Sequence, residues 1–159
     1  MKEYKITKFD PQNRLEGIYA VHEWTSISDV GKVFDSGVLT YQQYVQVEQN
    51  YIDCCIELLQ KSNIPELFVC SPEYYDKGLR FPSILYSENE IRRVIMLCLR
   101  EKCWVKLESD NFYIHFGYDY NMYIGTNLSA ICVQEIAKTH NLFCEEKASP
   151  YCSQDMDNV

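Results

Sequence analysis

Histidines, the side chains most suited to acid–base or metal chemistry near neutral pH, are few and scattered in this chain. The three are His22, His115 and His140. His22-Glu23 begins like the helical motif of a zinc metalloprotease, but Ser26 stands where that motif needs its second histidine. His140 falls at a predicted helix C-terminus, where a protonated imidazole complements the helix dipole. His115 lies in a predicted strand, and we expect it to face solvent or to make a hydrogen bond.

Carboxylates near one another could act as a general acid and a general base. Glu16 with Glu23, Asp119 and the Glu145-Glu146 pair are the candidates. None is accompanied by a second group that would position a substrate, and an acidic chain supplies such pairs by chance. Phosphate-binding glycine-rich loops, nucleophile elbows and kinase motifs are also missing from the sequence. The sequence therefore predicts no catalytic residue.

Eight cysteines raise the question of a disulfide framework or a metal site. No Cys-x-x-Cys pair occurs, which argues against a structural zinc site. Most of the cysteines occupy apolar positions, where Cys behaves as a small hydrophobic residue and its thiolate is disfavoured. We therefore expect reduced thiols, a cytoplasmic location, no metal and no cofactor. A cysteine nucleophile with a histidine base stays open, because such partners need not be close in sequence.

Helices must position these side chains, and their signals are strong. Apolar residues from Tyr44 to Leu59 recur at three- and four-residue spacing, which predicts a long amphipathic helix. Ser87 and Glu90 fit a capping box at the start of a second helix. The expected helices are a short one over 27–34 and longer ones over 40–62, 87–99 and 128–139.

Strands are predicted where apolar and polar residues alternate. Ser109-Asp110-Asn111 separates two such runs and is the best hairpin signal in the chain. Three strands in succession imply antiparallel pairing, so we expect an α+β fold, with a mainly antiparallel sheet of about five strands and three or four helices packed on it. The length fits a single domain over 1–149, with a frayed tail over 150–159. The expected strands are 3–9, 67–70, 103–108, 112–116 and 121–124, with a further candidate at 142–145.

The most aromatic part of the chain is the stretch 112–127, which has four tyrosines, two phenylalanines and a single acid. Tyrosine is common in cores, in interfaces and on ligand platforms, so composition alone does not decide its role. The two-residue strand period places Phe112, Ile114 and Phe116 on one face, which we expect in the core.

The other aromatic residues of this stretch form the expected contact surface. Tyr113 and His115 share the opposite strand face, and Tyr118, Asp119 and Tyr120 lie in or next to a turn. Two tyrosines flanking a carboxylate resemble an interface hot spot for Arg or Lys. If the turn is exposed, charge reversal at Asp119 combined with Tyr120→Ala weakens partner binding and leaves the fold intact.

The net charge of the chain limits the classes of partner that it is expected to bind. The chain has 23 acids against 15 bases, a formal charge of −8, which argues against nucleic acid or an anionic membrane and favours a basic partner. Acidity that merely keeps the protein soluble is the alternative. No apolar run of about 18 residues and no secretory leader is present, so we expect neither export nor a membrane span.

One segment carries a resemblance to a known family. The motif E-W-T-S-I-S-D-V-G-K-x-F, from Glu23 to Phe34, precedes Leu39-Thr40 and the long predicted helix. Over residues 1–65 this arrangement resembles small immunity proteins encoded beside bacterial polymorphic toxins and contact-dependent growth-inhibition toxins. The resemblance implies a cytosolic, non-enzymatic protein that blocks the toxic C-terminal domain of a cognate effector. We expect Trp24 itself to pack on the core more readily than to touch the toxin.

The partner implied by this resemblance is a basic toxin domain, often a nuclease, whose active site an acidic protein would occlude. No nucleic acid, membrane or small-molecule ligand is expected to bind. The alternatives are a small acidic cytosolic enzyme, either a hydrolase or a transferase, and a general protein-interaction module. The residues expected to contact the partner are Tyr113, His115, Tyr118, Asp119, Tyr120, Tyr123, Glu23 and Trp24.

Overall fold

The computed structural model describes residues 1–152, and its helices begin where their capping residues stand. Helix α1 (Tyr41–Ser62) starts after Thr40, whose side chain accepts the Gln43 backbone N–H while the Gln43 side chain returns to Thr40. Helix α2 (Glu88–Leu99) has the predicted capping box of Ser87 and Glu90. Helix α3 (Ala130–Thr139) is capped by Ser129. The three long helices predicted from the sequence are confirmed to within a few residues.

A seven-stranded sheet, antiparallel at every pairing, packs against these helices, with strand order β11-β1-β10-β9-β8-β6-β7. The α+β prediction is confirmed, although the sheet has seven strands instead of about five. The two-residue edge strand β7 was missed because so short a segment shows no period. The strands are β1 (Lys2–Thr7), β6 (Leu67–Tyr74), β7 (Ile84–Leu85), β8 (Cys103–Ser109), β9 (Phe112–Phe116), β10 (Met122–Thr126) and β11 (Phe143–Glu146).

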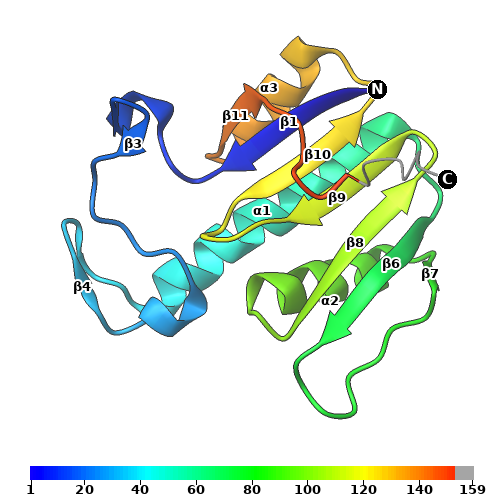
Figure 1. Cartoon of the computed structure of the whole chain (residues 1–159), viewed down its shortest axis with the longest axis horizontal. Coiled ribbons are helices and arrows are strands. Elements are labelled where there is room, and N and C mark those ends of the chain that lie inside the picture. Colours follow the sequence, from blue (N-terminus) through cyan, green and yellow to red (C-terminus); the bar gives the residue numbers. More distant parts are fainter. Residues whose placement is uncertain (153–159) are drawn as a thin grey trace, which may run out of the picture.

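The register of the strands shows which side chains share a face of the sheet. Tyr4, Ile124, Ile114 and Leu107 stand opposite one another on β1, β10, β9 and β8, and all four are buried. Figure 1 shows the three helices together on this side of the sheet. Because side chains alternate along a strand, the neighbouring residues face the helix-free side.

Residues between β1 and α1 form small projections beside the sheet. A pair of small hairpins, each made of two-residue strands, occurs there: β2–β3 (Arg14–Leu15 and Ile18–Tyr19) and β4–β5 (Val33–Phe34 and Gly37–Val38). The helix predicted over 27–34 is wrong, because only a single 3-10 turn forms at Ile27–Asp29. Gly31 follows with φ of 91°, outside the range of a right-handed helix, and turns the chain toward β4.

After β11 the chain returns across the helix-free face, as Figure 1 shows. We call residues 147–152 the C-terminal strap. The Lys147 N–H donates to the Glu3 carbonyl at 3.0 Å, and the Tyr151 ring lies 5.5 Å from that of Trp104. Of the tail predicted to be frayed, residues 150–152 thus belong to this strap, and 153–159 lie outside the described residues. None of the described helices is both long enough and apolar enough to cross a bilayer.

Candidate binding cleft

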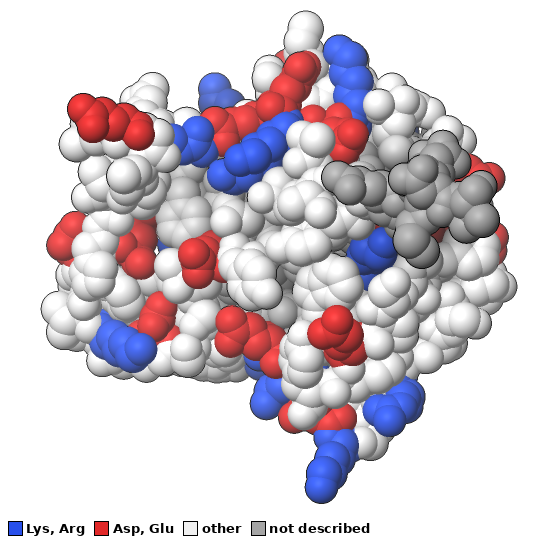
Figure 2. Space-filling model, in the orientation of Figure 1, with Lys and Arg blue, Asp and Glu red and all other residues white. Residues whose placement is uncertain are grey.

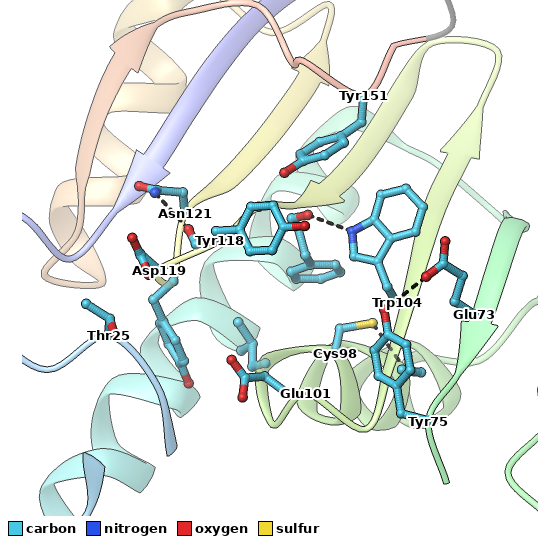
Figure 3. Close-up of a pocket in the computed structure, with 15 residues that line it drawn as sticks. Thr25, Glu73, Tyr75, Cys98, Glu101, Trp104, Tyr118, Asp119, Asn121 and Tyr151 are labelled. Atoms are coloured by element: carbon cyan, nitrogen blue, oxygen red, sulfur yellow. Dashed lines mark hydrogen bonds between the residues drawn. The ribbon is translucent and has the colours of Figure 1, made fainter. Parts of the chain in front are cut away.

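A cleft of about 450 Å³ opens where the β9–β10 turn, the α2–β8 connection and the strap meet. Figure 3 shows the side chains that project into it from these separate elements. The residues that line it include Glu73, Tyr75, Glu101, Trp104, Tyr118 and Asp119.

The β9–β10 turn supplies Tyr118 and Asp119. The Asn121 N–H donates to the Tyr118 carbonyl at 3.1 Å, and the two central residues, Asp119 and Tyr120, have φ of 55° and 62°. Two positive φ angles define a type I′ hairpin turn, in which Asn-Gly is the favoured pair. A bulky aromatic residue at the second position is strained. This turn points Tyr118 outward, 85% exposed, and Tyr120 inward, 6% exposed.

Glu101 is held on the opposite wall by a Schellman motif at the end of α2. The Glu101 N–H donates to the Cys98 carbonyl at 3.0 Å, and the Lys102 N–H donates to the Leu97 carbonyl at 2.9 Å. Glu101 itself has φ of 59°, at the position where helices most often have glycine. Two of the three cleft carboxylates, Glu101 and Asp119, therefore stand on left-handed backbone.

Aromatic rings form the rest of the wall. The Trp104 Nε1–H donates to the Phe116 carbonyl at 2.9 Å, which fixes the indole, and the Tyr75 hydroxyl donates to Glu73 at 3.1 Å. No Lys or Arg is among the described residues that line the cleft. Figure 2 shows acidic side chains grouped near the centre of the face in view. Carboxylates beside aromatic faces attract a guanidinium or ammonium group through ion pairing and cation–π contact.

Only part of the predicted contact surface reaches this cleft. Tyr118 and Asp119 are exposed there as expected. The expectation that Tyr120 is an exposed turn residue is wrong, because its ring lies 5.1 Å from Trp24 and 4.9 Å from Tyr51 in the core. Tyr120→Ala therefore does not leave the fold intact, and the double substitution proposed from the sequence would confuse binding with stability.

Three other predicted contact residues, Tyr113, His115 and Tyr123, lie on the helix-free face but beneath the strap. His115 is 1% exposed, so of the two expected alternatives it makes hydrogen bonds and does not face solvent. The strap covers it through Ser149, and the Tyr151 ring lies 6.1 Å from that of Tyr123. The strand period had placed Tyr113 and His115 together on one face, as observed, but the segment that covers them is more than twenty residues later in the chain.

His115 forms a hydrogen-bonded array with an acid and a serine. Its Nε2 lies 2.8 Å from Glu108 Oε1, and its Nδ1 lies 2.8 Å from Ser149 Oγ. An acid, a histidine and a serine in a row are the parts of a nucleophilic triad. Ser149 is only 7% exposed, however, and none of the three lines the cleft. In this conformation the array holds the strap on the sheet.

We expect the array to make stability depend on pH near neutrality. Burial lowers the pKa of His115 below its ordinary 6.5, against the opposing effect of Glu108 and with the help of Lys106. The unfolded chain thus binds the proton more readily, so this contribution is complete above about pH 6.5 and is lost as the pH falls through the folded-state pKa. Urea unfolding at about pH 7.5 and about pH 5.5 should show a smaller pH effect in His115→Gln than in the wild type. Equal pH effects in both proteins would contradict this assignment.

Trp24 and Glu23, the last predicted contact residues, lie near the other end of the cleft. Trp24 is buried, as expected, with its ring 5.4 Å from Tyr44. Glu23 accepts a hydrogen bond from the Tyr19 hydroxyl. Lys8 Nζ lies 4.1 Å from the Trp24 ring centroid, and burial lowers the pKa of Lys8 to about 8. Neither predicted residue lines the cleft, although the next one, Thr25, does.

Sequence reasoning missed the residues that complete the cleft: Glu73, Tyr75, Glu101, Trp104 and Tyr151. They come from β6 and the loop after it, the α2–β8 connection, β8 and the strap. The one local signal for any of them was that Glu101 follows a predicted helix end, where glycine is common. Among residues 1–152, no three potential metal ligands converge.

Comparison of the chain with protein-family models, curated proteins and solved structures found no match.

Proposed function

We propose that this chain is a binding protein that captures a basic partner in the acidic, aromatic-walled cleft. The observation that carries the proposal is the convergence of Glu73, Glu101 and Asp119 with exposed faces of Tyr75 and Tyr118 around one cavity. Within residues 1–152, the side chains of Glu101 and Asp119 form neither a hydrogen bond nor an ion pair. They are available to a guanidinium or ammonium group of the partner, which would also make cation–π contact with the aromatic faces.

Backbone strain supports a functional role for these carboxylates. Glycine would fit the left-handed conformation of Glu101 better, since a side chain there costs about 1–2 kcal/mol. Strained residues cluster at functional sites, where other interactions hold them in place. Glycine would be more stable at this position, so a carboxylate there is explained if its charge binds the partner.

The resemblance of the Trp24 segment to immunity proteins suggests which partner this is. We propose that the chain acts in the cytoplasm on the C-terminal domain of a cognate toxin, a nuclease whose basic active site it occludes. A net charge of −8 would steer such a domain toward it and complement its phosphate-binding surface.

An enzyme is the second candidate, and the Glu108–His115–Ser149 array is the observation in its favour. We favour the binding function, because the serine is buried and does not line the cleft. Covalent labelling of Ser149 by a fluorophosphonate in the folded protein would reverse that preference.

The proposed function is tested by co-expression with the C-terminal domain of the large protein encoded immediately upstream. We expect the cells to survive and the two proteins to co-purify in a fixed ratio. The triple variant Glu73→Gln, Glu101→Gln, Asp119→Asn should lose at least about 100-fold in affinity, because each charge-assisted hydrogen bond contributes about 1.5–3 kcal/mol.

A matched control separates the cleft from acidity in general. Glu16→Gln, Asp110→Asn, Glu135→Gln removes the same charge from exposed positions outside the cleft. It should bind nearly as well as the wild type. Equal losses of affinity in both triple variants would show that the cleft carboxylates act only through the net charge of the protein. Survival of the cells without any complex would contradict inhibition by binding.

Glu101→Gly separates binding from stability in a single residue. We expect the free energy of unfolding to rise by about 0.5–1 kcal/mol, because glycine relieves the left-handed strain at the end of α2. Partner affinity should fall about tenfold with the lost carboxylate. Urea denaturation and calorimetry measure the two effects.

Asn63→Gly is the control for Glu101→Gly. Asn63 ends α1 with φ of 53° and lies outside the cleft. This substitution should also preserve or raise stability, but it should leave affinity unchanged. If Glu101→Gly binds as tightly as the wild type, Glu101 is not a contact residue.

A further inference from the structure

Two cysteines, Cys98 and Cys103, lie next to each other in the wall of the cleft. Cys98 lies in the last turn of α2 and Cys103 is the first residue of β8. Their sulfur atoms are 3.6 Å apart, and both side chains line the cleft while being largely buried. Figure 3 shows Cys98 between Glu101 and Trp104. No other two cysteine sulfurs in residues 1–152 make such a contact.

The connection between the two cysteines is short and its backbone is hydrogen-bonded, so their approach is imposed by the backbone. The Schellman motif returns the Glu101 N–H to the Cys98 carbonyl itself. The Tyr75 N–H then donates to the Lys102 carbonyl at 3.1 Å, which joins this connection to the end of β6. A disulfide has its sulfur atoms about 2.05 Å apart, so the two must approach by about 1.5 Å to form one.

We propose that Cys98 and Cys103 are a reversible dithiol–disulfide pair, oxidised by low-molecular-weight disulfides that enter through the cleft. This chemistry needs no protein partner and is independent of the proposed binding function.

The two sulfurs have different roles in the exchange. Contact with the Cys98 sulfur and the nearby Arg93 guanidinium lower the pKa of Cys103, against the opposing effect of burial. The same contact, together with burial, raises the pKa of Cys98 well above its ordinary value. We assign Cys103, which lies near Arg93, as the attacking thiolate and Cys98 as the resolving thiol.

The reaction balances without any further oxidant. The Cys103 sulfur attacks the small disulfide, breaks its S–S bond, forms a mixed disulfide and releases one thiolate. That thiolate takes the proton of Cys98. The Cys98 sulfur then attacks Cys103, forms the Cys98–Cys103 bond and displaces the second small thiolate, which is protonated by solvent. The protein loses two electrons and the small disulfide gains them.

Other cysteines offer internal controls. Cys54 and Cys55 are fully buried on α1 and do not line the cleft. Cys152 is exposed on the strap, so it can form a mixed disulfide. Its sulfur contacts Glu3 and no second cysteine within the described residues.

The test treats the full folded chain with 2-hydroxyethyl disulfide, followed by acid quenching, alkylation and peptide mass spectrometry. We expect a Cys98–Cys103 crosslink to form with the loss of two thiols and no added mass, while Cys152 gains one mercaptoethanol group. Cys98→Ser should stop at the mixed disulfide on Cys103. Cys103→Ser should leave Cys98 at least about tenfold slower to react.

Should a serine variant fail to fold, Cys98→Ala replaces it, since alanine leaves no buried hydroxyl. The proposal is overturned if Cys98 and Cys103 stay reduced at reagent concentrations that fully modify Cys152. It is also overturned if either is crosslinked to a different cysteine first.

Discussion

Tyr120→Ala should destabilise the protein by about 3–5 kcal/mol, the range for removing a large aromatic ring from a core. The ring of Tyr120 is in edge contact with Trp24, Tyr44 and Tyr51. Its hydroxyl donates to that of Tyr44 at 2.8 Å, and burial raises its pKa, so the phenol stays neutral. Urea denaturation measures the change in the free energy of unfolding.

Two neighbouring variants show whether the ring or the turn is responsible. Tyr120→Phe keeps the ring and loses one buried hydrogen bond, which costs about 1 kcal/mol. Tyr118→Ala changes an exposed tyrosine of the same turn and should stay within about 0.5 kcal/mol of the wild type. A Tyr120→Ala protein as stable as Tyr118→Ala would contradict the inward placement of this side chain.

Arg100→Met should cost about 3–5 kcal/mol, because it leaves a buried carboxylate without its partner. Glu48 is 3% exposed and accepts two hydrogen bonds from Arg100, at 2.7 Å and 2.8 Å. It also accepts the Tyr44 hydroxyl at 2.8 Å, so this ion pair joins α1 and the end of α2 to the aromatic cluster around Tyr120.

The double variant Glu48→Gln, Arg100→Met tests this explanation. Gln keeps an acceptor for the Tyr44 hydroxyl but carries no charge, so most of the loss in Arg100→Met should be recovered. A double-mutant cycle from chemical denaturation would give the coupling energy. If the double variant is as unstable as Arg100→Met plus Glu48→Gln taken separately, the uncompensated charge is not the cause.

Local signals were enough to predict most of the elements. The capping box of Ser87 and Glu90 and the spacing of apolar residues after Thr40 are contacts within one or two helical turns. Strand alternation correctly placed Phe112 and Ile114 toward the helices and His115 away from them. These patterns work because a residue's side in a helix or strand depends on its own position in the repeat.

The functional surface did not follow from such patterns. Tyr118 and Asp119 were identified by composition, but their neighbour Tyr120 turns inward because a type I′ turn reverses its direction toward Trp24 and Tyr44. Sequence alone shows neither the turn type nor the cavity that receives the ring, since Tyr44 is 76 residues away from Tyr120.

The sequence by itself determined the fold class, the three long helices to within a few residues, the faces of the central strands and the acidic character of the chain. Only the tertiary structure decided which residues meet at the cleft, that the strap covers His115, and that Cys98 and Cys103 come within 3.6 Å. The physical reason is the range of the interactions. Caps and periods act between near neighbours, whereas a binding site is assembled from loops whose relative positions depend on the packing of the whole sheet.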